Sequence, residues 1–248
     1  MHPALTITDH RPWPLPSGRW TWRQSWCDLL FAHWPVPAKQ LRPLIPASLE
    51  VQEFDGTAWV GVIPFHMTGV MRRPWPDMPG LSAFAELNVR TYVERDGKPG
   101  VWFLSLDATN RLAVWAARRF FHLPYHLSDM QITPQGSGFD YRSHRKNSEQ
   151  DASFVAHYRP TSDAFHAKSG TIDHWLTERY CLYAESPGGQ LYRCDVHHVP
   201  WSLQQASVTI EQNTISAANN GIELTGEPTY THFARRVDAL VWPLERVG

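Results

Sequence analysis

The hairpin between Phe84 and Ala108 constrains the fold of this chain more than any other segment. Successive residues of its first strand, FAELNVRTYVER, point to opposite faces, and one face is apolar apart from a threonine: Ala85, Leu87, Val89, Thr91 and Val93. The other face aligns Glu86, Asn88 and Arg90. After the turn DGKPG, the strand VWFLSLDA is apolar at nearly every position, which predicts burial on both of its faces. We therefore expect the polar face of the first strand to be enclosed as well.

Most of the remaining chain also predicts strands, with few helices between them. A strand is indicated at residues 20–34, with a break near Asp28, and shorter strands follow the hairpin. Asn110 can cap the longest expected helix. Three helical segments are expected: PAKQLRPLI, RLAVWAARRFFHL and TIDHWLTER.

The composition is that of a globular chain. Of its 248 residues, 42% are hydrophobic and 19% are charged, which allows a sizeable core. No repeat or low-complexity linker divides the chain, so we predict an extended arm over residues 1–18 and a single domain over residues 19–248. The formal net charge is −1 and the basic residues are scattered, so nucleic acid is not expected as a partner.

The cysteines and the N-terminal segment indicate a cytoplasmic protein. Cys27, Cys181 and Cys194 lie far apart without a CxxC spacing, and an odd number of cysteines argues against a disulfide framework. Residues 1–18 lack the basic segment and apolar run of a signal peptide, and no stretch approaches the ~20 apolar residues that span a bilayer. A soluble cytoplasmic protein without a membrane partner is expected.

Several blocks of the sequence resemble a known family. They are LLFAHWPVPAKQLRPLIPASLE, FDGTAWVGVIPFHMTGV, ELNVRTYV with GVWFLSLDA, ARRFFHLPYH, LTERYCLY and HHVPW. Together they resemble the uncharacterised bacterial YqjF-like family, which looks like a branch of the acetoacetate decarboxylase-like superfamily. The resemblance implies an α+β, mostly antiparallel β fold, with the sheet closed into a cone-shaped barrel, small flanking helices and an interior pocket.

The resemblance also identifies the position at which the decarboxylases react. Those enzymes form a Schiff base with a lysine that follows a proline, and a second lysine lowers the pKa of the first. Here the comparable proline is Pro124, and Tyr125 and His126 stand where the two lysines would be. No lysine of this chain lies in an apolar setting that would lower its pKa: Lys39, Lys98, Lys146 and Lys168. Schiff-base chemistry is therefore not expected.

The candidate catalytic residues are Glu86, Tyr125 and His126. Glu86 can accept a proton or pair with Arg90, and it also matches the glutamate that the resemblance implies for the pocket. Tyr125 can donate a proton or hold an oxyanion, and His126 titrates near neutral pH. The alternative for Glu86 and Arg90 is a structural salt bridge on an exposed sheet face.

The candidate ligand-binding residues include Asn88 and Arg90 of the polar row, with Arg90 holding an anionic group. Arg118 ends the predicted helix near the reactive position, although a cation there also interacts favourably with the helix dipole. Arg179 is either a ligand group or one half of a buried ion pair with Glu178.

His198 completes the candidate ligand-binding residues. His197 and His198 are neighbours on a predicted strand, so their rings point to opposite faces and only one of them reaches the pocket; the sequence does not decide which. For the same reason the two imidazoles cannot easily bind one metal ion. No metal site and no cofactor are predicted.

The sequence favours a small-molecule pocket protein that acts as an enzyme on a carbonyl or carboxylate compound by acid–base chemistry. A non-catalytic ligand-binding or sensor protein using the same cavity stays open, as does a structural partner whose polar rows are only salt bridges. The expected partner is a small anionic ligand, and homo-oligomer formation is also open. An acid–base pair that converges in a cavity would separate the first reading from the other two.

Overall fold

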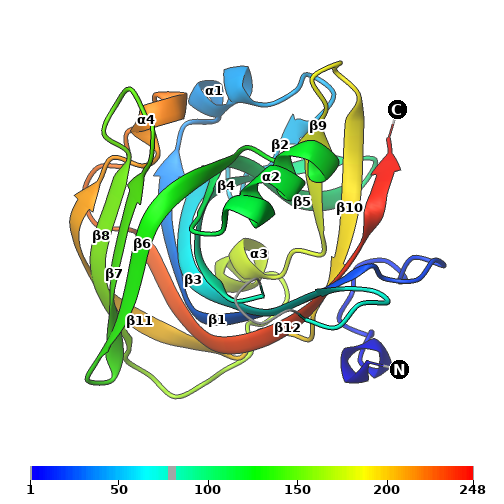
Figure 1. Cartoon of the computed structure of the whole chain (residues 1–248), viewed down its shortest axis with the longest axis horizontal. Helices are drawn as coiled ribbons and strands as arrows, with labels where there is room; N and C mark the ends of the chain where they lie inside the picture. Colours follow the sequence, from blue (N-terminus) through cyan, green and yellow to red (C-terminus); the bar gives the residue numbers. More distant parts are fainter. Residues whose placement is uncertain (1, 78–81, 248) are drawn as a thin grey trace.

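The computed structural model describes residues 2–77 and 82–247, so the outermost residues of the predicted arm and domain, Met1 and Gly248, lie outside the described residues. Strands dominate the described chain (Figure 1). They are β1 (Trp22–Val36), β2 (Glu50–Val51), β3 (Ala58–Arg72), β4 (Phe84–Arg95), β5 (Lys98–Ala108), β6 (Tyr125–Gln135), β7 (Gly138–Arg145), β8 (Ser153–Pro160), β9 (Cys181–Glu185), β10 (Leu191–His197), β11 (Leu203–Asn213) and β12 (Tyr230–Arg246). The helices are short: α1 (Ala38–Leu41), α2 (Arg111–Phe121), α3 (Ile172–Thr177) and α4 (Ala217–Asn220), with 3-10 turns at Pro3–Thr6 and Arg42–Leu44.

The described strands belong to one sheet of twelve strands, and this sheet closes on itself twice. Because β10 pairs with β12 and β4 pairs with β5, a first ring forms in the order β9, β10, β12, β1, β3, β4 and β5. β6, β7, β8 and β11 connect β5 back to β12, so a second ring shares five strands with the first. Among the described pairings, those of β5 with β6 and with β9 are parallel and the others are antiparallel. The predicted α+β, mostly antiparallel architecture is confirmed.

The two rings explain why both faces of β4 are enclosed. Leu87 and Val89 pack in the main hydrophobic core with Tyr141 and Phe154 of the second ring. Glu86 lies on the opposite face, inside the first ring, and is only 2% exposed. The alternation along β4 therefore separates an apolar core from a polar interior, as the sequence predicts.

A bulge in β1 keeps one face of this strand inside the first ring. Trp22, Gln24 and Trp26 face the interior, as do Leu29 and Phe31, so the inward positions change from even to odd numbers between them. The change occurs at Asp28, which has a φ of 53° and lies where the pairing with β3 shifts register. One extra residue in a strand reverses the faces of all later residues. The predicted break near Asp28 is this bulge within a continuous strand.

Two helices lie over the interior of the first ring in Figure 1, α2 and α3. Asn110 caps α2 as predicted, because its Oδ1 accepts hydrogen bonds from the backbone N–H groups of Leu112 (3.0 Å) and Ala113 (3.1 Å). Thr171 caps α3 in the same manner, accepting a bond from the N–H of His174. None of the described helices is long and apolar enough to cross a membrane.

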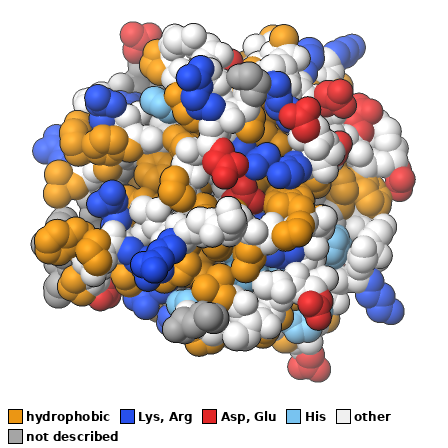
Figure 2. Space-filling view, turned by 90° about the vertical axis from the view of Figure 1, so that its right-hand side faces the viewer, with side chains coloured by type: hydrophobic (Ala, Val, Ile, Leu, Met, Phe, Trp, Pro, Cys, Tyr) orange, Lys and Arg blue, Asp and Glu red, His pale blue; other side chains and the backbone are white. Residues whose placement is uncertain are grey.

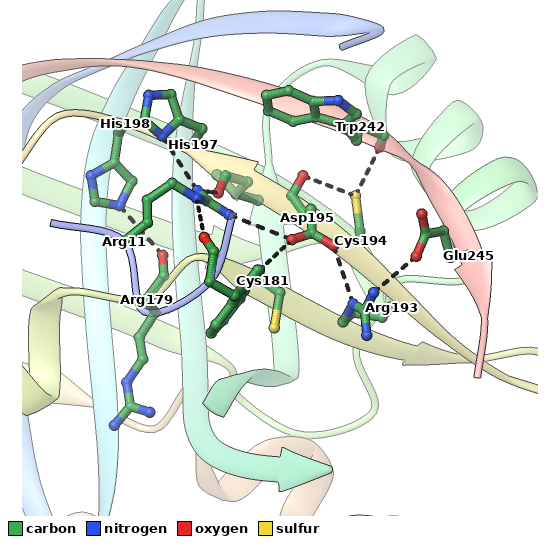
Figure 3. A network of polar contacts seen from close by, with 12 residues as sticks. Arg11, Arg179, Cys181, Arg193, Cys194, Asp195, His197, His198, Trp242 and Glu245 are labelled. Atoms are coloured by element: carbon green, nitrogen blue, oxygen red, sulfur yellow. Dashed lines mark hydrogen bonds and ion pairs between the residues drawn. The ribbon is translucent and has the colours of Figure 1, made fainter. Parts of the chain in front are cut away.

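The N-terminal segment packs against β10. Arg11 donates hydrogen bonds to the carbonyl oxygen of Val196 (2.7 Å) and to Nδ1 of His197 (3.3 Å), and it forms an ion pair with Asp195 (3.5 Å) (Figure 3). Trp13 Nε1 also donates to Asp195.

The sequence predicts an extended arm over residues 1–18; the structure shows a 3-10 turn near its start and a polar anchor at Arg11. On this face of the molecule, basic and acidic side chains are interspersed (Figure 2).

Candidate functional site

The first ring encloses a cavity of about 200 Å³, here called the ring cavity, and all seven of its strands contribute to the wall. Most of the wall is apolar and aromatic, and includes Trp22, Trp26, Phe31, Ile63, Phe65, Met67, Phe84, Phe103, Leu106 and Trp201. α2 contributes Ala113, Ala116, Ala117 and Phe121. The polar groups of the wall are Gln24, Glu86, Asn88, Arg90, Tyr125, Thr177, Arg179 and His198. The ring cavity is thus an apolar chamber with a small number of polar groups.

Glu86 and Tyr125 form a buried hydrogen-bonded pair in this wall. The hydroxyl of Tyr125 donates a bond of 3.0 Å to Oε2 of Glu86. Burial raises the pKa of Glu86 to about 8, although hydrogen bonds from Tyr125 and Asn88 act in the opposite direction. Burial and the nearby Glu86 raise the pKa of Tyr125 well above its usual range. At neutral pH the pair therefore consists of a mostly protonated carboxyl group and a neutral phenol.

Arg90 and Arg179 bring two guanidinium groups to the other end of the polar series, next to α3. Arg90 donates to the carbonyl oxygen of Leu176 (3.1 Å) and to the hydroxyl of Tyr92 (3.4 Å). Arg179 donates to the carbonyl oxygen of Trp175 and to the side-chain oxygen of Gln52. Among the described residues, no carboxylate lies within ion-pair distance of either guanidinium.

The guanidinium of Arg179 is buried and lies over two aromatic rings. Its guanidinium carbon lies 4.4 Å from the ring centre of Trp175 and 4.6 Å from that of Tyr92. Burial lowers the pKa of Arg179 to about 10, and the positive charge of Arg90 contributes to this shift. The predicted alternative of a buried Glu178–Arg179 pair is not what the structure shows, because Glu178 instead accepts bonds from Tyr180 and from the backbone N–H of Trp201.

His198, and not His197, faces the ring cavity. Its Nδ1 lies 2.8 Å from the carbonyl oxygen of Val199, so the proton of the neutral ring is assigned to Nδ1. The ring stacks on Tyr180 with 4.8 Å between ring centres, and burial lowers its pKa. His197 points to the opposite face, where its ring bonds the carbonyl oxygen of Ala4 at 2.7 Å. The two imidazoles therefore lie on opposite sides of the chain, although β10 ends at His197 and His198 is the first residue beyond it.

Two of the predicted site residues do not reach the ring cavity. His126 follows Tyr125 on β6, and because successive strand residues point to opposite faces, an inward Tyr125 directs His126 away from the cavity. Burial and the charge of Arg145 lower the pKa of His126 to about 4. Arg118 is exposed on the outer side of α2, and its Nε donates to the carbonyl oxygen of Tyr125.

Several wall residues did not stand out in the sequence as site residues. The aromatic residues of β1, Trp22 and Trp26, are as typical of a hydrophobic core as of a cavity wall. Ala113 and Ala117 of α2 are spaced four residues apart, a spacing that places them on one side of a helix. This row of small side chains is the signal from which a cavity beneath α2 could have been predicted.

The other potentially reactive groups are the lysines and the cysteines, of which Cys181 and Cys194 line the ring cavity. No lysine contributes to the wall of the ring cavity as the described residues define it. Cys181 and Cys194 are free and buried, and burial raises the pKa of the Cys181 thiol to about 12, so it is a poor nucleophile. Within residues 2–77 and 82–247, no three His, Cys, Asp or Glu side chains are grouped in a way that could hold a metal ion.

Comparison with known proteins places the chain among its relatives. Residues 23–238 match the family DUF2071, described as "Uncharacterized conserved protein". The chain belongs to this family. It is also 48% identical over 232 residues to "Uncharacterized protein YqjF" of Bacillus subtilis (strain 168), a match that covers 94% of this chain and 95% of that protein. The resemblance to the YqjF-like family is therefore confirmed.

Solved structures with a similar fold are acetoacetate decarboxylase-like. An acetoacetate decarboxylase has a TM-score of 0.66 at 13% identity, covering 93% of this chain and 90% of its own. An acetoacetate decarboxylase-like enzyme from Sphingomonas wittichii RW1 has a TM-score of 0.63 at 11% identity, covering 98% and 99%. The enduracididine biosynthesis enzyme MppR, complexed with pyruvate, has a TM-score of 0.62 at 11% identity, covering 97% and 93%. At these identities the likeness establishes the fold alone.

Borohydride treatment in the presence of acetoacetate or pyruvate should leave the mass of the protein unchanged. Reduction would trap an imine only if an uncharged lysine amine had attacked the ketone. Tyr125 and His126 cannot form such an imine, and the four lysines lie away from the ring cavity. Mass spectrometry of the intact protein provides the measurement. A stable adduct on any lysine would show that Schiff-base chemistry does occur.

Proposed function

We propose that this protein binds a small organic carboxylate in the ring cavity and acts on a carbonyl group of that ligand by acid–base chemistry. The observation that carries the proposal is the pair Arg90 and Arg179, which both line the cavity and have no carboxylate partner among the described residues. Buried charges in proteins are normally paired, because leaving an isolated charge out of water is costly. A bound carboxylate would supply the counter-charge.

The hydrogen-bonding capacity of the two arginines supports an anionic ligand. Nε of Arg90 and one terminal nitrogen of Arg179 are buried and have no hydrogen-bond partner among the described residues. A guanidinium group presents its donors in a planar fork that matches the two oxygens of a carboxylate. Burial and the like charge of Arg90 lower the pKa of Arg179, and a bound anion would raise it again by stabilising the charged guanidinium.

Glu86 supplies the acid–base part of the proposal. General acid–base catalysis is most efficient when the pKa of the group lies near the working pH, and the pKa of Glu86 is about 8. At neutral pH the carboxyl group can donate a proton to a ligand oxygen, and its ionised minority can accept one. Tyr125 remains neutral and positions the carboxyl group through its hydrogen bond to Oε2.

A non-catalytic ligand-binding or sensor protein is the second candidate. The hydrogen bond between Tyr125 and Glu86 favours it, because two groups that already bond each other can form a fixed part of a polar wall without any proton transfer. Both candidates keep a small anionic molecule as the partner and the cytoplasm as the compartment, with no nucleic acid or membrane required. Conversion of a bound ligand would separate the enzyme from the sensor.

Thermal unfolding with matched ligands tests the proposal. Hexanoate should raise the unfolding temperature at pH 7 by about 3–6 °C at roughly ten times its Kd. Hexanamide, which has nearly the same shape but no charge, should raise it much less. A wider panel of metabolite carboxylates then identifies tighter ligands. Equal shifts with hexanoate and hexanamide, or no shift with any carboxylate, would contradict an anion site at the arginines.

A further inference from the structure

We infer that the ligand is a monocarboxylate with an apolar body of medium length, and that the alanine row of α2 sets the length of that body. The inference rests on the proposed carboxylate site and adds what lies at its other end. The row is formed by Ala113, Ala116 and Ala117, and all three line the ring cavity.

The ring cavity has two chemically different ends. β4 runs along it and contributes Phe84, Glu86, Asn88 and Arg90 in order. Phe84 and Arg90 therefore stand at opposite ends of this row, with Glu86 and Asn88 between them. The guanidinium end lies against α3, where Arg90 bonds the carbonyl oxygen of Leu176. A carboxylate held there directs the rest of the molecule past Glu86 and towards Phe84.

The end near Phe84 is apolar and is covered by α2. Phe84, Ala113 and Ala117 pack in one hydrophobic cluster with Tyr125. Phe121, the last residue of α2, lines the cavity and contacts the ring of Trp22, with 6.1 Å between ring centres. Beyond Glu86, therefore, a ligand would meet apolar groups contributed by α2 and the adjoining strands.

The cavity is too large for the smallest carboxylic acids to fill. Its volume of about 200 Å³ is more than ten times the roughly 10–15 Å³ that a cavity needs to hold one water molecule. Acetate would fill only a small part of this space and would leave the alanine row without contact. A body of about five to eight carbon atoms, alkyl or aryl, would fill it and bury its apolar surface.

A residue on the outer side of α2, Trp115, provides a matched control. Trp115 is 60% exposed and does not line the ring cavity, although it lies between the cavity-facing Ala113 and Ala117 in the sequence. Replacing it by leucine changes an apolar side chain of α2 without changing the charge or the cavity. Trp115→Leu should therefore bind ligands in the same manner as the unaltered protein.

Binding of a series of straight-chain acids tests the inference. The Kd values of acetate, butyrate, hexanoate, octanoate and decanoate are measured from tryptophan fluorescence, since Trp26 and Trp201 line the cavity. Affinity should rise about fourfold for each added methylene until the chain reaches α2, and then stop rising. Ala117→Leu should move this limit about two or three carbons shorter. Phe121→Ala, which removes bulk at the same end, should move it longer.

The outcomes separate this inference from the proposed function. One outcome is that carboxylates bind with an affinity that is independent of chain length, or with the same length limit in Ala117→Leu, Phe121→Ala and Trp115→Leu. Either result would show that α2 does not set the length. The inference would then be wrong, but the carboxylate site would stand. If no acid of the series binds, the proposed function itself is wrong. The two substitutions act in opposite directions, so a folding defect in one leaves the other as a test.

Discussion

Glu86→Gln should make the protein more stable at neutral and alkaline pH by as much as about 5 kcal/mol, an order-of-magnitude figure. The reason is the buried setting of Glu86, which raises its pKa from 4.5 to about 8. Between these two values the unfolded chain has lost the proton and the folded protein keeps it. The folded state then binds more protons than the unfolded state, so stability falls as pH rises through this window.

Urea unfolding at pH 5, 7 and 9, followed by tryptophan fluorescence, measures this effect. The free energy of unfolding of Glu86→Gln should exceed that of the unaltered protein by less than about 1 kcal/mol at pH 5, by about 3 kcal/mol at pH 7 and by the full difference at pH 9. Glu50→Gln removes an exposed carboxylate of β2 and serves as the control, with no comparable pH dependence. A constant difference between Glu86→Gln and the unaltered protein at all three pH values would show that Glu86 titrates normally in the fold.

The position of Glu86 in the cavity wall could be predicted from the sequence because a single strand fixes it. Alternation along β4 depends only on local geometry, and the apolar return strand β5 indicated that both faces of the hairpin are covered. The face that carries Leu87 and Val89 enters the main core, and the face that carries Glu86, Asn88 and Arg90 enters the first ring.

Closure of the rings could not be predicted in the same manner. It depends on the pairing of β10 with β12, which skips β11, and on the pairing of β1 with β12, which lie near opposite ends of the chain. The residues themselves do not specify such partners, and here the resemblance to a family supplied the expectation. The bulge at Asp28 shows a second limit. The sequence indicates a break at this position, but not that the strand continues through it with its inward face reversed.

The candidate residues that stay outside the cavity have a simple geometric reason. Tyr125 and His126 were assigned together because both occupy the positions of the decarboxylase lysines. Neighbours on a strand cannot both face one interior, and here Tyr125 faces inward. Arg118 lies on α2, but on the side opposite the alanine row. Which of these side chains faces the cavity depends on how β6 and α2 are oriented relative to the ring, and the sequence does not specify that orientation.

Replacing Arg90 should strongly weaken carboxylate binding without a matching loss of stability. The half-buried guanidinium of Arg90 has no carboxylate partner among the described residues, so Arg90→Met removes an uncompensated charge as well as two hydrogen bonds. If Arg90 instead formed a structural ion pair, its loss would cost roughly 3–5 kcal/mol. Arg90→Lys keeps the charge but loses the planar fork that binds two carboxylate oxygens.

Titration calorimetry of hexanoate into these variants at pH 7 tests the carboxylate site most directly. Arg90→Met should bind at least about thirtyfold more weakly than the unaltered protein, which corresponds to the roughly 2 kcal/mol or more lost when one partner of a buried charge pair is removed. The hexanoate affinity of Arg90→Lys should lie between those of Arg90→Met and the unaltered protein. Arg119→Met removes an exposed arginine of α2 and should bind hexanoate as tightly as the unaltered protein. Thermal midpoints within about 3 °C of one another would show that the fold is intact. Equal hexanoate affinity in Arg90→Met and the unaltered protein would contradict the proposed site.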